Sequence, residues 1–515
     1  MVIALDSVST IIILLYFVGL IAIGALASKK IKNSEDFLVA GRNLGFWTFT
    51  ILIVASICSG MTILGVAGLG YATGWPSIWE QIFVPLSAAV CILFFGTKLH
   101  AVASKTGYVT VQDYFAHRFY SPRGIRGTSA IIGVLISIIY LVGQYVAISM
   151  VLSWLFKIPY LWALLIGAFI VTGYTILGGL YAIGMASLVQ GIMILVGVLL
   201  VGPVVIEAAG GMTHINTVLA GIDVNMTHLW YPQMNPPYAK YAFLTPEYLV
   251  SFFFMLTLGL AAAPHVVNNV LAARDIKYFK WAPLAAFVIY AVIMYLCKIT
   301  GFAALSMVHE GLIALPKGVP NPSDYSFIAA SEYVFPGFFA PLVAIIVLSA
   351  VMSTTDRLML TIGTYVSWDV YRQFINKDAS EKSITLLSRA AILLATFLTL
   401  WLAWSNPPDL LAWLIWMAIG VILACFVTPL FAGLYWRRAT REGALASMIV
   451  GLVGALAFSY YARYVAPMPM HPSIYGFALS VAAMILVSLV TEKPSEKVLD
   501  ETSTGMFIRV KDRKA

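Results

Sequence analysis

The stretch Ser349–Leu360, SAVMSTTDRLML, lies inside a long apolar run and yet contains three consecutive hydroxyl residues, Ser353 to Thr355, followed by Asp356 and Arg357. Ionisable side chains inside an apolar span carry a free-energy cost, so they face protein or water and commonly mark a functional site. The stretch therefore predicts a polar site in the interior of a membrane-spanning helix.

The composition is that of a membrane protein with many spans. Of the 515 residues, 61% are hydrophobic and 10% are charged, whereas an ordinary soluble domain is roughly 25% charged. Apolar stretches of about 20 residues, long enough to cross a hydrocarbon core of about 30 Å, recur along the chain. We predict an all-α polytopic membrane protein of about thirteen spans, centred near Tyr16, Ala55, Val90, Ile138, Leu165, Leu195, Met255, Ile289, Val347, Leu393, Ile419, Leu452 and Ala482.

The distribution of Lys and Arg predicts the orientation of these spans. Basic residues near span ends tend to stay in the cytoplasm, and with the N-terminus outside most of them fall in the inner segments. We therefore predict one transmembrane domain over residues 1–490 in the plasma membrane and a cytoplasmic tail over residues 491–515. The net charge of +8 belongs to the cytoplasmic rim, so the expected partner is the lipid bilayer and not nucleic acid, and the oligomeric state stays open.

Two spans contain stretches of small and hydroxylated residues. These are Ala55–Gly65, ASICSGMTILG, in the second span and Ser349–Leu360 in the ninth. Such stretches permit unwinding that frees backbone carbonyls to line a cavity, but they also permit ordinary close packing of helices. We expect both spans to be interrupted, with packing as the alternative.

The ninth span places oxygen atoms on one helix face. Because each residue advances about 100°, Ala350, Ser353, Thr354 and Arg357 fall within an arc of roughly 100°. A hard monovalent cation takes oxygen ligands, which hydroxyls and the carbonyls of a broken helix supply. The alternative is that the hydroxyls bond back to carbonyls one turn earlier.

Several motifs in order resemble those of the sodium:solute symporter family. They are SAVMSTTD, DFLVAGRNLG (Asp36–Gly45), VQDYFAHRF (Val111–Phe119), PHVVNNVLAARD (Pro264–Asp275) and GLYWRRATREGA (Gly433–Ala444). The resemblance implies the inverted-repeat fold of the leucine transporter type, with broken helices at the midplane. It also implies sodium-coupled symport of a small organic solute, with sodium held by the carbonyls of Ala55, Cys58 and Ala350 and the hydroxyls of Ser353 and Thr354.

The sequence departs from the commoner family pattern at three positions. Ile57 and Ser187 stand where many members carry an acid, and Asn269 stands where an Arg is common. We therefore expect one coupling ion, and a proton-coupled or uncoupled transporter of the same fold remains the alternative.

Arg357 has three interpretations. In the first, its side chain reaches the cytoplasmic water and Asp356 caps the helix at the same end. In the second, it pairs with another acidic side chain in the core. In the third, its two-pronged guanidinium binds a carboxylate of the solute. The third interpretation bears on the class of solute.

The predicted substrate site lies around the break and on neighbouring spans. Positions that are aromatic in proline-type members are Met61, Tyr140 and Leu256, so only Tyr140 keeps a ring, and Gln144 follows it by one turn on the same face. The stretch Trp404–Gly420 resembles the pantothenate and monocarboxylate branches. We predict a small carboxylate such as pantothenate or a monocarboxylate, with a proline-type amino acid as the alternative, and a substrate site formed by Ser59, Met61, Thr62, Tyr140, Gln144, Leu256 and Arg357.

An enzyme is not expected. It needs a convergent nucleophile and base or a metal cluster, and the sequence shows no such pattern. None of the seven His residues lies three or four positions from another, so helical metal-ligand spacing is absent. We expect no cofactor apart from sodium as the coupling ion.

Overall fold

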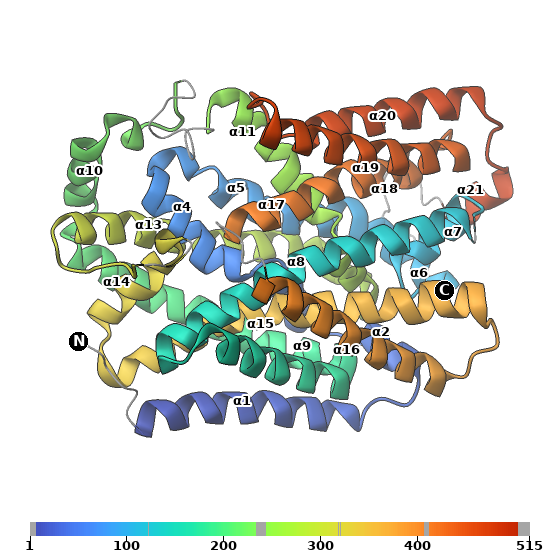
Figure 1. Ribbon diagram of the computed structural model, residues 1–515. Coiled ribbons are helices and arrows are strands. Elements are labelled where there is room, and N and C mark those ends of the chain that lie inside the picture. Colours follow the sequence, from blue (N-terminus) through green and yellow to red (C-terminus); the bar gives the residue numbers. More distant parts are fainter. Residues whose placement is uncertain are drawn as a thin grey trace.

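The computed structural model describes residues 7–121, 123–232, 244–317, 319, 321–405 and 411–502. Throughout these residues the regular elements are helices, and most of them lie side by side with roughly aligned axes (Figure 1). The membrane-spanning elements are α1 (Ser7–Ser28), α3 (Phe46–Ile57) with α4 (Val66–Thr73), α5 (Glu80–Val90) with α6 (Thr97–Thr106), α8 (Gly124–Phe156), α9 (Tyr160–Ala208), α11 (Pro246–Phe253) with α12 (Pro264–Val267), α13 (Ala282–His309), α15 (Ala340–Thr364), α16 (Glu381–Ser405), α17 (Leu411–Ile422) with α18 (Thr428–Tyr435), α19 (Arg441–Tyr464) and α20 (Ser473–Val490). Shorter helices are α2 (Ser34–Val39), α7 (Val111–Arg118), α10 (Gly211–Ile222), α14 (Ser326–Val334) and α21 (Glu496–Thr502).

The number of spans follows from the lengths and bends of the helices. Within the described ranges, ten helices are long and apolar enough to cross a membrane, and two bent pairs raise the number to twelve. Helix α9 has 49 residues, or about 74 Å at 1.5 Å per residue, which exceeds twice the hydrocarbon thickness. The backbone of Gly179 leaves the helical region there, with φ 49° and ψ −145°, and dividing α9 at this glycine gives the predicted thirteen spans.

The second span is broken where the sequence predicts. Helix α3 ends at Ile57, and the chain passes through Cys58–Gly60 into the π-helical turn η2 (Met61–Gly65) and then α4. The two parts are bent by 62°. The predicted interruption within Ala55–Gly65 is therefore confirmed.

The other break lies in the seventh span, and the expectation that the ninth span is interrupted is wrong. Helix α11, extended by η6 (Phe254–Gly259), meets the segment from α12 to η7 (Asn268–Ala272) at 41°. Pro264 disfavours the helical conformation of the preceding residue, and Ala263 has ψ 130°. Helix α15 is continuous into η11 (Tyr365–Ile375), so its small and hydroxylated residues do not interrupt it.

Helix α15 lies at the centre of the bundle. Its most apolar window is 94% buried, compared with 28% for α1 and α20, and it packs against α8, α9 and α16. In Figure 1, α1 and α20 lie at opposite edges of the molecule with α15 between them. The stretch that carries SAVMSTTD is therefore surrounded by protein.

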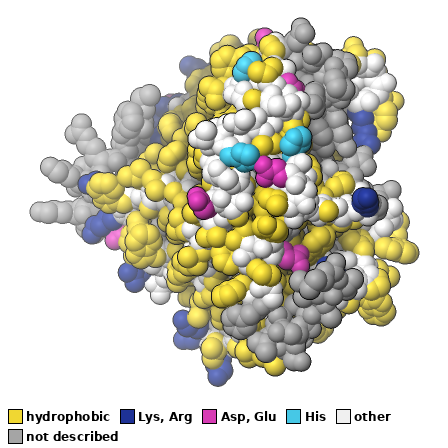
Figure 2. Space-filling model, turned by 90° about the vertical axis from the view of Figure 1, so that its left-hand side faces the viewer, with side chains coloured by type: hydrophobic (Ala, Val, Ile, Leu, Met, Phe, Trp, Pro, Cys, Tyr) yellow, Lys and Arg dark blue, Asp and Glu magenta, His cyan; other side chains and the backbone are white. Residues whose placement is uncertain are grey.

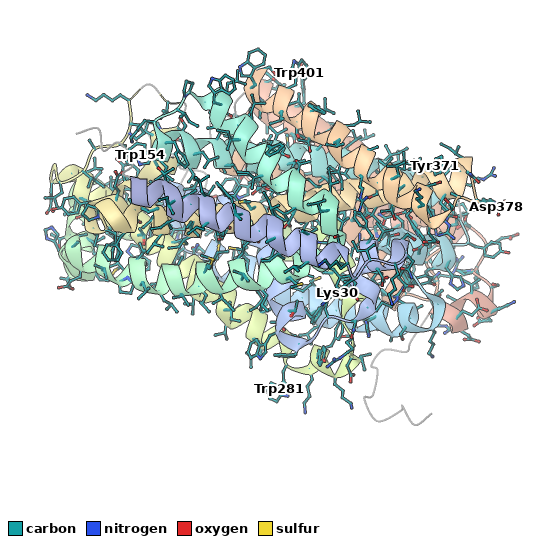
Figure 3. All side chains as sticks on the ribbon, turned by 90° about the horizontal axis from the view of Figure 1, so that it is seen from below. Lys30, Trp154, Trp281, Tyr371, Asp378 and Trp401 are labelled. Carbon is teal, nitrogen blue, oxygen red and sulfur yellow. The ribbon has the colours of Figure 1, made fainter. Side chains whose placement is uncertain are left out.

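The two ends of the bundle carry different elements. Helix α10 lies at the end where α1 begins, and Figure 2, viewed from that end, shows histidine and acidic side chains among hydrophobic ones. In Figure 3, Tyr371 and Asp378 lie at one end of the bundle and Trp154 lies toward the other. Helix α21 packs back onto the domain, since Glu501 pairs with His117 at 2.9 Å, while tail residues 503–515 lie outside the described residues.

Candidate sodium and substrate site

Two hydroxyls of α15 lie against the break in the second span. Ser353 Oγ is 3.0 Å from the carbonyl oxygen of Ala55 and 3.0 Å from that of Ala350. Thr354 Oγ1 is 3.0 Å from the carbonyl oxygen of Cys58 and 3.1 Å from that of Ala55. All five residues are fully buried. The structure therefore brings together the five oxygen atoms that the sequence assigns to sodium.

The break explains why the carbonyls of Ala55 and Cys58 are free. In a continuous helix they would accept from the N–H groups four residues later. Instead, Ser59 N donates to Thr62 Oγ1 at 3.1 Å and Thr62 N donates to the carbonyl of Ser59 at 2.9 Å. A hydroxyl has one proton to donate, so Ser353 and Thr354 leave acceptor capacity in this group, which suits a hard cation.

The three hydroxyls differ in how far they bond back to carbonyls of their own helix, which was the alternative to binding a cation. Thr355 Oγ1 donates back to the carbonyl of Val351 at 2.7 Å, and Ser353 has one such contact within its own helix. Thr354 Oγ1, by contrast, contacts carbonyls of the broken span, those of Ala55, Ser56 and Cys58. Thr354 is therefore the clearest candidate ligand.

A small cavity adjoins the break. The cavity has a volume of about 10 Å³, which is roughly the space that one water molecule needs. Four predicted substrate residues line it, namely Ser59, Met61, Thr62 and Tyr140. The sequence prediction missed the other lining residues, which are Ile57, Val66, Val84, Leu260, Tyr290, Met294 and Ile419.

Tyr290 is the missed residue with the clearest polar role. Its hydroxyl lies 2.8 Å from Thr62 Oγ1 and donates to the carbonyl of Ile57 at 3.1 Å. The side chain is fully buried. A tyrosine within the apolar first half of the eighth span is the signal that sequence reasoning had available.

The remaining predicted substrate residues do not line this cavity. Gln144 Oε1 instead accepts from the backbone N–H of Gly60 at 3.1 Å, so it holds the break in place. Leu256 is buried in η6. The proline pair in Trp404–Gly420 lies outside the described residues.

Arg357 and Asp356 are not at a water-exposed rim, which corrects the first interpretation of Arg357. Their exposed fractions are 2% and 0%, because α15 continues well beyond them to η11. Asp356 Oδ2 accepts from the hydroxyl of Tyr174 at 2.8 Å, so it does not cap a helix end. Arg357 Nε lies 3.4 Å from the carbonyl oxygen of His265, and the ion pairs found in the described residues do not include Arg357.

Two of the three positions that depart from the commoner pattern, Ile57 and Asn269, lie close to the break. Asn269 Nδ2 donates to Ser56 Oγ at 2.9 Å, which joins the seventh span to the second. Ile57 lines the cavity, and Ser187 is buried in the second half of α9. None of the three supplies a charge to the site.

Two broken spans, with free carbonyls facing hydroxyls of a central helix, define a secondary transporter rather than an enzyme. The chain belongs to the sodium:solute symporter family, a model of which matches residues 37–451. It is a multi-pass membrane transporter, and sodium is the coupling ion that this family implies. The family that the motifs predict is thereby confirmed.

Curated relatives match along nearly the whole chain. The osmoregulated proline transporter OpuE of Bacillus subtilis is 26% identical over 486 residues, covering 94% of each chain. The sodium/proline symporter of Haemophilus influenzae is 26% identical over 508 residues, covering 94% of this chain and 95% of the relative. The sodium/pantothenate symporter of Escherichia coli is 25% identical over 489 residues, covering 92% and 94%.

Solved structures confirm the predicted fold. A sodium-coupled sialic acid symporter in a substrate-bound outward-open state aligns with a TM-score of 0.76 and 17% identity, covering 94% of this chain and 98% of its own. MhsT in complex with L-phenylalanine aligns with a TM-score of 0.51 and 13% identity, covering 87% and 98%. These likenesses show that the chain has the fold of the leucine transporter type.

Proposed function

We propose that the protein is a symporter that uses one sodium ion to drive a small carboxylate-bearing solute across the plasma membrane. The observation that carries the proposal is the meeting of the carbonyls of Ala55, Cys58 and Ala350 with the hydroxyls of Ser353 and Thr354. In the proposed orientation the N-terminus lies outside and the C-terminus lies in the cytoplasm, as the distribution of basic residues favours.

Sodium at this place would link two parts of the protein, the break of the second span and the centre of α15. The break of the second span supplies two carbonyls and α15 supplies the other three oxygens. An ion that holds them together favours the conformation in which the break is packed on α15. Binding of solute beside the same break would favour that conformation too, and reciprocal linkage then couples the two ligands.

The solute class rests on the cavity and on the relatives. Relatives are named for proline and for pantothenate, and both compounds carry a carboxylate. The cavity offers the hydroxyls of Ser59, Thr62 and Tyr140 beside apolar side chains such as Met61. Pantothenate, a monocarboxylate and proline are therefore the solutes to test.

The test is uptake of labelled pantothenate, lactate, pyruvate, acetate and proline into proteoliposomes. Each solute is given with an inward sodium gradient, with an inward proton gradient or with neither, and each series is repeated with Ser353→Ala/Thr354→Ala. The proposal expects sodium-driven uptake of at least one solute that disappears in the double variant. Uptake that follows protons, or that the double variant keeps, would contradict sodium coupling at this site.

A further inference from the structure

Two buried hydrogen-bond donors lie together beyond the cavity. Arg357 and His265 are 2% and 1% exposed, and Arg357 Nη1 and His265 Nε2 have no hydrogen-bond partner among the described residues. The two residues are neighbours, since Arg357 Nε lies 3.4 Å from the carbonyl oxygen of His265. A buried donor without a partner costs about 1–3 kcal/mol, and more when it is charged.

Another buried arginine shows how this protein satisfies a structural guanidinium. Arg118 is 1% exposed, and its Nε, Nη1 and Nη2 donate to the carbonyls of Gly433, Ala439 and Trp436 at 2.9, 3.2 and 3.0 Å. These contacts use the guanidinium to cap the end of α18. Arg357 has one long carbonyl contact instead, so a capping role does not account for its charge at the centre of the bundle.

His265 lies behind a residue of the cavity. The ring of Tyr140 lines the cavity and meets the ring of His265 edge to face, with centroids 5.2 Å apart and planes at 86°. Displacement of the Tyr140 ring would expose the ring of His265 to the cavity. Asp356, the acid next to Arg357, is held by Tyr174 through its Oδ2, and its helical position is about 100° away from that of Arg357.

We propose that Arg357 and His265 bind the carboxylate of the transported solute on the inner side of Tyr140. The histidine carries its proton on Nε2 and donates to one carboxylate oxygen, while Arg357 Nη1 donates to the other. Charge-assisted bonds of this kind are roughly twice as strong as neutral ones. The inference rests on the proposed function, in that the solute must carry a carboxylate, and it makes His265 a specificity residue.

The experiment compares each acid with an analogue that lacks the carboxylate. Whichever solute the wild-type protein takes up is paired with such an analogue, which is pantothenol for pantothenate, prolinamide for proline, lactamide for lactate, pyruvamide for pyruvate or acetamide for acetate. Equilibrium binding of both is measured on the purified full-length protein at saturating sodium. The variants are Arg357→Gln, Arg357→Lys, His265→Leu and His265→Gln.

In the variants we expect a loss of the preference for the acid over its analogue, and not a general loss of binding. The wild-type protein should prefer the acid by about tenfold or more, as two charge-assisted bonds allow. Arg357→Gln and His265→Leu should remove most of that preference while analogue binding stays within about twofold. Arg357→Lys should be intermediate because it loses the fork, and His265→Gln should retain most of the preference because its amide still donates.

A control on the same helix separates this role from a structural one. Thr361 lies one turn after Arg357 and donates back to its carbonyl at 2.8 Å, so Thr361→Val should leave the preference unchanged. Thermal unfolding midpoints are recorded for every variant. Equal weakening of acid and analogue, together with a lowered midpoint, would show that Arg357 and His265 are only structural and would overturn the proposal.

The two proposals fail in different ways. If the wild-type protein shows no sodium-dependent binding of any solute, the proposed function is wrong and this inference falls with it. If sodium-dependent binding is present, and Arg357→Gln keeps both that dependence and the preference for the acid, then only the carboxylate site is wrong.

Discussion

Ser353 Oγ lies 3.0 Å from the carbonyl oxygen of Ala55, a residue 298 positions earlier in the chain. The contact joins the centre of α15 to the last turn of α3, just before that helix breaks. Neither partner is unusual alone, since one is a buried serine and the other a backbone carbonyl. Their contact places side-chain oxygens beside carbonyls that the break has released, which is the geometry on which the proposed coupling depends.

Thr354→Val should weaken sodium coupling, and Thr355→Val should not. Thr354 contacts the carbonyls of Ala55 and Cys58, whereas Thr355 only bonds back to Val351. Losing one ligand should raise the half-saturating sodium concentration for uptake by about tenfold, or about 1.4 kcal/mol. The measurement is initial uptake rate against sodium concentration, and equal shifts in the two variants would contradict the assignment.

Tyr174→Phe should lower the stability of the protein. The hydroxyl of Tyr174 donates to the buried carboxylate of Asp356 at 2.8 Å, and removing it leaves that acceptor unsatisfied, which costs about 1–3 kcal/mol. Tyr145→Phe is the matched control, because the hydroxyl of Tyr145 contacts neutral hydroxyl groups, at 3.4 Å in the case of Thr396, and not a buried carboxylate. Thermal unfolding in detergent checks the prediction, and a midpoint no lower than that of the control would refute it.

Glu80 and Lys298 form a fully buried ion pair at 2.9 Å that joins α5 to α13. Glu80→Gln and Lys298→Met should each destabilise the protein by about 3–5 kcal/mol, because each leaves a buried charge without its partner. The double variant Glu80→Gln/Lys298→Met leaves neither charge, so it should regain most of the loss. Unfolding midpoints of the single and double variants test this, and additive losses would show that the charges are not coupled.

Gly179→Ala should impair folding, and Gly173→Ala in the same helix should not. Gly179 has φ +49°, and a Cβ there would lie 2.5 Å from the carbonyl oxygen of Phe37, while a Cβ at Gly173 has nothing within 4 Å. Only glycine adopts such a backbone without strain. The yield of monodisperse protein in size-exclusion chromatography measures the effect, and normal yield for Gly179→Ala would contradict the assigned turn.

The sequence predicts much of this architecture because apolar run length and motif order carry the information. The small and hydroxylated residues of Ala55–Gly65 predict a break in the helix, and the structure has one there. The break at Pro264 had an equally local signal, since proline restricts the residue before it. The sequence instead predicts a break in the ninth span, because the hydroxyl-rich composition of α15 is typical of an interrupted helix. A continuous helix accommodates such residues as well, since Thr355 donates its hydroxyl to a carbonyl of its own helix.

The sequence does not show which side chains from helices far apart in the chain contact one another. The burial of Arg357 and the contact between Tyr174 and Asp356 depend on how α9, α12 and α15 pack. Helical geometry places residues on a face of their own helix but does not say which neighbour covers that face. For the same reason, the sequence predicts that Gln144 contacts the solute, whereas in the structure its side-chain carbonyl oxygen accepts from the N–H of Gly60 at the break.

The most direct test of the central claim is equilibrium binding of ²²Na⁺ to the purified protein, with Ser353→Ala/Thr354→Val compared with Thr355→Val. The account predicts saturable binding of one ion per chain in the wild-type protein and in Thr355→Val, and loss of that binding in the double variant. Unchanged sodium binding in Ser353→Ala/Thr354→Val would show that the ion is held elsewhere and would contradict the account.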